Sequence, residues 1–245
     1  MLLLRRSTVA LGLIAAACAP SDERRDDARA ADDAVAGVRG DSTGFADSSV
    51  TDSERSLLAG ICLRGDPSQG EPWFIDRIAD RVALLSLDAL QRLPPRDSAR
   101  YMARLTRNAD ALSADTTVAD FRGLPVVVRD AWRVVPMEGD TIYIAITARR
   151  LPMESNPLEE QVTLFAAPAA TPTVRDALTT TWFARTAGSE DSLETRDPLL
   201  AFAAADGRLR VVLLRETALG PRIELLARSD GGWTLRWEGV VARCD

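Results

Sequence analysis

Residues 199–237, LLAFAAADGRLRVVLLRETALGPRIELLARSDGGWTLRW, contain four short runs in which apolar and polar side chains alternate. Successive side chains of a β-strand point to opposite faces, so this period of two is typical of half-buried strands. Turn sequences separate the runs at 206–207, 219–221 and 230–232, and the Asp-Gly pair at 206–207 indicates a two-residue hairpin. The stretch therefore predicts four consecutive antiparallel strands, a β-meander.

The period of two extends back to about residue 124. It predicts four earlier strands, at 126–134, 141–149, 162–165 and around 180–185. The run VVLL at 211–214 is apolar at every position, which is typical of a strand that is covered on both faces. We therefore expect about seven or eight antiparallel strands, with cover on each side of part of the sheet.

The region ahead of these strands has a helical period. From Trp73 to Leu93, apolar residues recur at helical spacing, and the proline pair at 94–95 ends that run. A second helix is expected to begin with Asp97 as its cap and to carry the apolar stripe Tyr101, Met102, Leu105, Ala109 and Leu112. Its arginines, Arg96, Arg100, Arg104 and Arg107, are interpreted as a solvated face.

These patterns predict an α+β fold, in which an N-terminal helical pair packs on a mostly antiparallel sheet of about seven to eight strands. A sandwich or a barrel with the helices against one face is the alternative shape. Residues 56–245 have the length of one large domain.

The composition limits the chemistry. The chain has 245 residues, no histidine and a net charge of −6, and all 30 of its basic residues are arginine. The missing residue types exclude Ser-His-Asp and Cys-His catalysis, histidine zinc sites and lysine Schiff bases. An enzyme would depend on Asp, Glu, Ser, Tyr, Arg or a metal held by oxygen ligands. No motif indicates a metal site or a cofactor, and whether the chain is an enzyme stays open, with a non-catalytic role favoured.

Two of the three cysteines are expected to pair. Cys62 opens the folded region and Cys244 is the penultimate residue, and thiols of exported domains tend to form disulfides. A bridge would close a loop of about 180 residues, which in the chain-entropy description contributes roughly 5 kcal/mol. The alternative is two unpaired, buried cysteines.

The N-terminus resembles the signal peptide and lipobox of bacterial lipoproteins. Arg5 and Arg6 precede an apolar run, and the small residues 15–17 lead directly into Cys18. The resemblance covers only about 20 residues, departs from the usual lipobox at Ala15, where leucine is common, and implies that residues 1–17 are removed and that Cys18 carries lipid. The alternatives are an ordinary signal peptide and a transmembrane helix, for which the run is too short.

Residues 18–55 are expected to form the lipidated cysteine and a disordered acidic tether. From Ala19 to Arg55 there are 10 acidic residues and 5 arginines, and few large apolar side chains. A flexible segment of this length spans roughly 30–35 Å. Subtracting the tether (−5) and the signal peptide (+2) from −6 leaves −3 on residues 56–245, so no basic excess suggests nucleic acid. The expected location is the cell envelope, more specifically the periplasmic face of the outer membrane.

Two further features bear on function. Trp233 and Trp237, four residues apart on a predicted strand, are expected to share one face, where they form either core or a platform that contacts a ligand. Glu159 and Glu160 are neighbours on a strand and should point to opposite faces, so they are not expected to act as a catalytic pair.

Three functions remain open. The first is a non-catalytic envelope lipoprotein that binds a protein or glycan partner. The second is a ligand-binding lipoprotein with an apolar pocket between the helices and the sheet. The third is a carboxylate-dependent hydrolase of envelope glycans, which requires a deep cleft with two facing carboxylates.

Overall fold

The computed structural model describes residues 50–64, 74–77, 82–116, 121–153, 156–170, 177–189, 192–230 and 232–244. All of them belong to one compact unit, Ala46–Asp245. In this part of the chain, thirteen strands form three sheets and two α-helices accompany them. The predicted signal peptide, Cys18 and most of the predicted tether lie outside the described residues.

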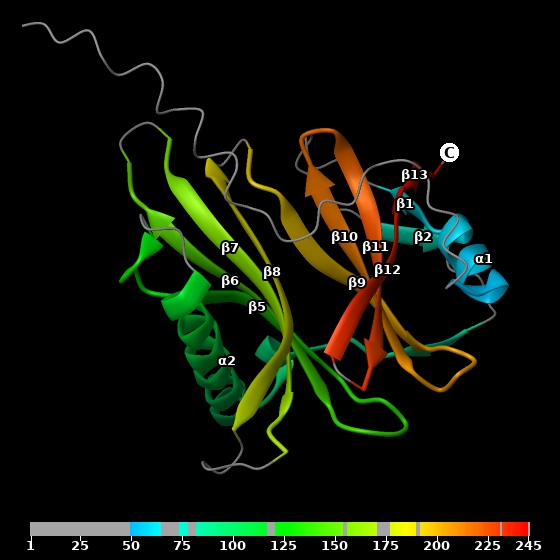
Figure 1. Ribbon diagram of the computed structural model, residues 1–245, viewed down its shortest axis with the longest axis horizontal. Helices are drawn as coiled ribbons and strands as arrows, with labels where there is room; N and C mark the ends of the chain where they lie inside the picture. Colours follow the sequence, from blue (N-terminus) through cyan, green and yellow to red (C-terminus); the bar gives the residue numbers. More distant parts are fainter. Residues whose placement is uncertain are drawn as a thin grey trace, which may run out of the picture. The chain divides into compact units, whose positions relative to one another are not determined.

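Two five-stranded sheets make up the body of the fold (Figure 1). The first, the β4–β8 sheet, contains β4 (Asp88–Ala89), β5 (Val127–Val134), β6 (Ile142–Leu151), β7 (Leu158–Pro168) and β8 (Leu178–Ser189) in that order. The second, the β9–β12 sheet, has β3 (Ala83–Leu85) at one edge, followed by β9 (Thr195–Ala203), β10 (Leu209–Thr217), β11 (Gly220–Ser229) and β12 (Gly232–Val240). Neighbouring strands within both sheets are antiparallel.

The inner faces of these sheets pack against each other and form the central core. Ile144 and Phe165 come from the β4–β8 sheet, and Val211, Leu213 and Leu226 come from the β9–β12 sheet. All five side chains are fully buried. The arrangement is a β-sandwich, in which alternating inward-facing residues of both sheets supply the core.

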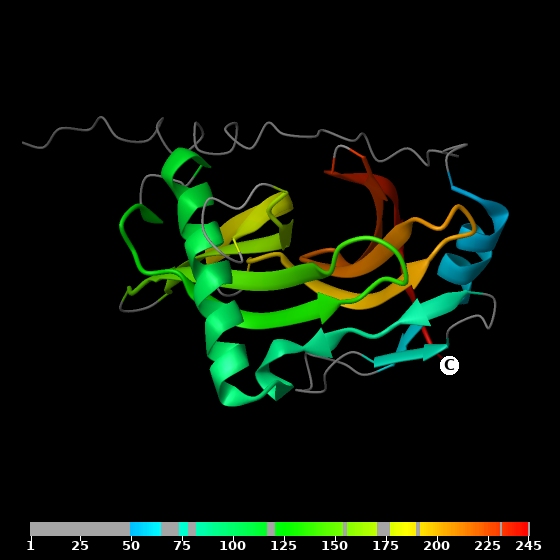
Figure 2. The same ribbon diagram turned by 90° about the horizontal axis from the view of Figure 1, so that it is seen from below.

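The two helices lie on opposite outer faces of the sandwich (Figures 1 and 2). Helix α2 (Pro95–Thr116) packs Leu105 and Ala109 on the β4–β8 sheet. Helix α1 (Asp52–Gly60) packs Leu57 and Leu58 on the β9–β12 sheet. The predicted α+β class, with a helical pair on one sheet of seven to eight strands, is therefore wrong: the fold is mostly β, and each helix covers a different sheet.

The region predicted as the first helix explains this error. It contains β2 (Phe74–Arg77), β3, β4 and a short 3₁₀ helix, η3 (Leu90–Arg92). Its apolar residues do recur at helical spacing, but β2 pairs with the preceding strand β1, and β3 and β4 pair with β9 and β5, which are distant in sequence. These long-range backbone bonds override the weak local preference for a helix.

The ends of both helices differ from the expected positions. Helix α2 begins at Pro95, whose fixed φ suits the first helical position, so Asp97 lies in the first turn and is not the cap. Helix α1 begins at Asp52, four residues before the predicted start of the folded region. A capping box holds this start, because the Thr51 side chain accepts from the Glu54 N–H and the Glu54 carboxylate accepts from the Thr51 N–H.

The eight predicted strands correspond to β5–β12, and one hairpin differs in detail. The β9–β10 loop has three central residues, Ala205, Asp206 and Gly207, because the Gly207 N–H donates to the Ala204 carbonyl and the Ala204 N–H donates to the Arg208 carbonyl. Gly207 has φ +73°, the left-handed conformation that this type of loop requires.

A third, small sheet joins the two ends of the described chain, and its order is β13 (Ala242–Arg243), β1 (Cys62–Arg64), β2. Strands β1 and β13 are parallel, and the Cys244 N–H donates to the Leu63 carbonyl over 3.0 Å. Cys62 and Cys244 form a disulfide here, which confirms the predicted pair.

Candidate functional site

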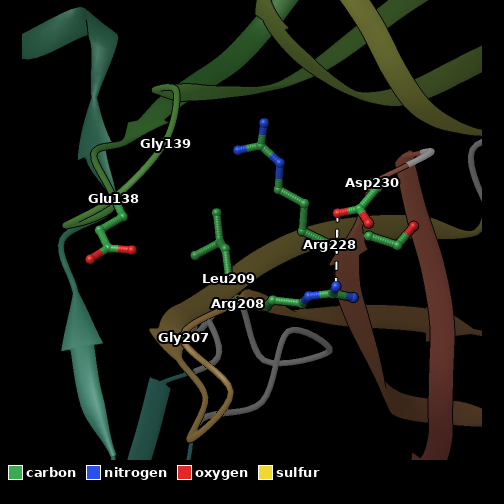
Figure 3. A pocket seen from close by; sticks show the side chains of 8 residues that line it. Glu138, Gly139, Gly207, Arg208, Leu209, Arg228 and Asp230 are labelled. Carbon is green, nitrogen blue, oxygen red and sulfur yellow. Dashed lines mark ion pairs between the residues drawn. The ribbon is translucent and has the colours of Figure 1, made fainter.

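The described surface is hollowed where three connections meet at one end of the sandwich. The β5–β6 loop, the β9–β10 loop and the β11–β12 turn enclose a hollow of about 260 Å³, with the Leu209 and Arg228 side chains between them (Figure 3). A neighbouring hollow of about 310 Å³ shares Glu138, Gly207 and Leu209 with the first. Together they are called the loop-end hollow below.

Ion pairs connect the walls of the loop-end hollow. Arg208 lies 3.8 Å from Asp230, which joins the β9–β10 loop to the β11–β12 turn (Figure 3). Arg228 of β11 reaches the β5–β6 loop, where it donates to the Asp140 carbonyl over 3.3 Å and lies 4.0 Å from the Asp140 carboxylate. All these groups are substantially exposed except Arg228, so the pairs are weak individually and mainly orient the loops.

Apolar side chains lie exposed beside the loop-end hollow. Met137, which lines its second part, is 85% exposed, and Val135 on the same loop is 55% exposed. Leu85 and Ala203 continue the apolar lining inward. Small-molecule sites are usually enclosed pockets of about 300–1,000 Å³. Each of the two parts of this hollow is open and has a volume near the lower limit of that range. Their shape suits a side chain of a partner better than a buried small molecule.

The space between α2 and the β4–β8 sheet is filled. Leu105 and Ala109 of α2 contact the cluster that contains Tyr143, Ala145 and Leu164, and all five are buried. Among the described residues, the apolar pocket that the ligand-carrier hypothesis places between helix and sheet is therefore occupied by core side chains.

Glu159 and Glu160, the neighbouring carboxylates of β7, bind different arginines. Glu159 pairs with Arg129 of β5. Glu160 is 1% exposed and lies 3.6 Å from Arg149 and 3.2 Å from Arg185. Their separate partners agree with the expected opposite orientations. Since a catalytic acid must contact a substrate, these two ion-paired groups act in the packing of the sheet.

A second charged network lies between the sheets at the end away from the loop-end hollow. Arg196 donates to Glu224 over 3.0 Å, and the Thr163 hydroxyl of the opposite sheet donates to the Arg196 carbonyl over 3.2 Å. Arg215 lies 2.7 Å from Glu194 and 3.4 Å from Glu238. Burial by itself would lower the Arg215 pKa, but these carboxylates raise it, so the guanidinium remains charged.

Asp197 on β9 is the described carboxyl group with a raised pKa. Burial is the main cause, and the negative charges of Glu216 and Asp130 add to it, so that its pKa is about 6. Raised carboxyl pKa values occur at catalytic sites as well as in buried networks. Asp197 does not line the loop-end hollow.

The two tryptophans do not share a face. A β-bulge at Arg236 shifts the register of β12, because Leu225 faces Trp237 whereas Leu226 faces Leu235. Trp233 therefore packs in the central core, 4.8 Å from Phe165, and donates to Thr181 over 3.2 Å. Trp237 joins the core on the α1 side.

The prediction of one shared tryptophan face is thus wrong. Neither indole lines the loop-end hollow, and a ligand contact through either of them stays a prediction.

Sequence reasoning missed two features. The first is the exposed Met137 in the segment 137–140, because the sequence around this methionine does not indicate that its side chain is exposed. The buried pair between Glu54 and Arg210, 2.7 Å apart, was missed because residues up to 55 were assigned to the tether. The capping signature T-x-x-E at 51–54 could have shown that a helix begins there.

No group of three or more Cys, Asp or Glu side chains in the described part of the chain is arranged to hold a metal ion. No helix that the structure describes combines the length and the apolar character needed to span a bilayer. Comparison of the chain with protein-family models, curated proteins and solved structures gave no significant match.

Proposed function

We propose that this protein is a lipid-anchored lipoprotein of the cell envelope, whose folded part binds a protein partner at the loop-end hollow. One observation carries the binding role: an open hollow has the exposed Met137 in its lining, whereas the buried carboxylates of β7 are held by arginines. An exposed apolar group with a polar rim is typical of a protein-binding surface.

The charges around the hollow fit such a contact. Arg228 and Arg208 supply donors, Asp140 and Asp230 supply acceptors, and the pairs they form are weak enough to exchange partners. Met137 can adapt its unbranched side chain to the surface of a partner. The lipid on Cys18 would keep this surface within reach of other envelope components.

Site-specific photo-crosslinking tests the binding role. A photoreactive residue at Met137 should give a discrete adduct in native membranes, and Val135→Asp should abolish it by placing a charge beside the contact. Leu219 is the matched control, because it is apolar and 94% exposed but lies in the β10–β11 turn at the other end of the sheet. Equal adducts from positions 137 and 219 would contradict the proposal. Lysine-directed crosslinkers have no side-chain target here.

The anchor has a separate test. Mass spectrometry of the mature protein should identify a diacylglyceryl-modified Cys18 as the first residue. An unmodified N-terminus at another position would refute the lipoprotein assignment. The crosslink at Met137 would still test the binding role.

Asp197 favours one alternative, a carboxylate-dependent hydrolase of envelope glycans. Its raised pKa would suit a general acid. Release of reducing ends from purified envelope glycan, lost in Asp197→Asn and retained in Asp206→Asn, would support that alternative over the binding role.

A further inference from the structure

We propose that the outward face of helix α2 binds the anionic surface of a membrane through the phosphates of lipid headgroups. This inference rests on the proposed function in one respect: a lipid anchor keeps the domain close to a bilayer. The binding face is the arginine stripe, defined as Arg96, Arg100, Arg104 and Arg107.

The arginine stripe lies opposite the face that packs on the sheet. Leu105 and Ala109 are buried against the β4–β8 sheet. With 3.6 residues per turn, the four arginines fall within about 80° of one another, and the centre of the stripe lies roughly 145° from Leu105. Arg96, Arg100 and Arg107 are exposed, and α2 forms the outermost layer on this side of the sandwich (Figure 2).

The stripe does not serve the stability of the helix. Arg96 and Arg100, and Arg100 and Arg104, are like charges at i,i+4 spacing, which disfavours the helix. Arg96 also lies in the first turn, where the helix dipole disfavours a positive charge. Within the helix, Arg100 lies 3.1 Å from Asp97. Arg96 and Arg107 make no ion pair within the part of the chain that the structure describes.

An aromatic ring holds two of the guanidiniums near one another. The guanidinium carbons of Arg100 and Arg104 lie 5.1 and 5.5 Å from the centre of the Tyr101 ring. Tyr101 itself stacks on Tyr143 of β6, with 5.0 Å between ring centres. Cation–π contacts of this kind restrain the side chains without neutralising them. The planar guanidinium of arginine is suited to bidentate contact with phosphate oxygens.

The anchor geometry permits this contact. Helix α1, near which the described chain begins, lies on the opposite side of the sandwich from α2 (Figure 1). The 31 residues between Cys18 and Val50 can span at most about 100 Å, which exceeds the thickness of a small domain. Because the anchor raises the local concentration of the stripe at the bilayer, four arginines are sufficient for a weak contact to matter.

Vesicle flotation with the full chain carrying Cys18→Ser isolates this contact from lipidation. The protein should bind vesicles that contain phosphatidylglycerol about tenfold or more better than pure phosphatidylcholine vesicles, and 0.5 M salt should remove the difference, as expected for arginine–phosphate pairing (roughly a 4 Å Debye length). The variant R96Q/R100Q/R104Q/R107Q should lose the preference. The residues of the apolar leader remain in every variant and contribute equally.

Two controls keep the result interpretable. The variant R96K/R100K/R104K/R107K retains the charge and should retain the preference. The variant R55Q/R64Q/R236Q/R243Q removes the same charge from elements on the other side of the sandwich and should also retain it. Circular dichroism checks that each variant is folded.

Equal binding by the arginine-to-glutamine stripe variant and its parent would overturn the inference, as would binding to DNA without binding to anionic vesicles. Such a result would not affect the mass spectrometry of Cys18 or the photo-crosslinking at Met137, because both are measured on the chain with Cys18 intact.

Discussion

Among the described glycines, Gly239 has the least space for a side chain, because the Trp237 ring lies against it. A Cβ atom added at Gly239 would lie 2.2 Å from two ring atoms of Trp237, so the indole lies directly over this glycine. Trp237 is packed against the α1-side core and cannot move freely. We expect Gly239→Ala to lower the free energy of unfolding by about 1–3 kcal/mol through overpacking, measured by urea denaturation. The double variant Trp237→Leu/Gly239→Ala should show little further loss relative to Trp237→Leu alone, and an additive loss would contradict this account.

Asp197 gives the stability of the fold a dependence on pH. Its pKa is raised from 3.8 to about 6, so between these values the folded state binds more protons than the unfolded state. The stability contribution is therefore most favourable below about pH 4 and is lost as the pH rises through 6. Asp197→Asn should stabilise the protein at pH 8, by at most about 3 kcal/mol, and the difference should disappear near pH 4. Urea denaturation at both values measures it.

Asp206 is the control for this prediction because its pKa is lowered. Burial would raise that pKa, but hydrogen bonds from the Arg208 N–H and the Arg210 side chain outweigh it. Asp206→Asn should therefore destabilise the protein at pH 7, and its effect should fade in acid. If both variants shift stability in the same direction, the assigned charge environments are wrong.

At the scale of single residues, the sequence predicted the cysteine pair and the alternation of side chains along the strands, but it did not predict where a strand departs from that alternation. The Cys62–Cys244 disulfide was predicted from the number of cysteines and the expected export of the domain. The separation of Trp233 and Trp237 did not, because the bulge at Arg236 depends on how β12 pairs with β11. A single extra residue reverses which face every later side chain occupies, and nothing in the local pattern marks it.

At the scale of elements, helix α1 depends on one buried ion pair. Arg210 of β10 donates to Glu54 over 2.7 Å, and both side chains are less than a tenth exposed. Burial would raise the Glu54 pKa, but hydrogen bonds from Thr51 and Arg210 lower it. The stabilisation is therefore present above about pH 4.5 and is lost as the pH falls through the lowered pKa.

The variant Glu54→Gln tests this pair while keeping a residue that can complete the capping box. It leaves the buried Arg210 charge with the half-exposed Asp206 as its remaining acidic partner among the described residues, so we expect a loss of at most about 3–5 kcal/mol at pH 7. Adding Arg210→Met should recover much of that loss, because the double variant buries no unpaired charge. A double-mutant cycle from thermal or urea unfolding measures the coupling, and a coupling near zero would show that the pair does not hold α1.

Strands β5–β12 could be predicted because each is long, alternates regularly and is bounded by a turn. Strands β2, β3 and β4 have four residues or fewer, and β3 and β4 depend on partners more than 40 residues away. Helix α2 was found from its apolar stripe, whereas α1 was missed because acidic residues at 52 and 54 resembled the tether. Short elements carry too little local signal to decide their own structure.

At the scale of the whole molecule, the predicted number of strands did not show that they belong to two different sheets. The eight predicted strands form two consecutive meanders, β5–β8 and β9–β12, which belong to different sheets. Strand β3 is an edge of the β9–β12 sheet and the next strand, β4, is an edge of the β4–β8 sheet, so the chain crosses between the sheets here. This segment was predicted as helix. Because the crossing between two sheets was not predicted, the simplest arrangement was a single sheet with a helical pair on one face. The loop-end hollow could not be predicted either, because it forms only where loops from both sheets meet.

The disulfide joins the two ends of this arrangement. Cys62 and Cys244 are 182 residues apart, and β1 and β13 pair beside the bond. Constraining a loop of this length in the unfolded chain contributes up to about 5 kcal/mol, so reduction should lower the unfolding midpoint in urea substantially. Cys62→Ser/Cys244→Ser should reproduce the effect and should be insensitive to reductant.

Hydrogen exchange should then separate two explanations for this loss. If the bond acts on the unfolded chain, the amides of both large sheets lose protection together when it is removed, since global unfolding becomes easier. If it acts only by holding the small sheet, the losses should be confined to β1, β2 and β13. We expect the first outcome, because the three-stranded sheet shares its core with α1 and the β9–β12 sheet, so local release of β1 would also expose Leu63 from that cluster.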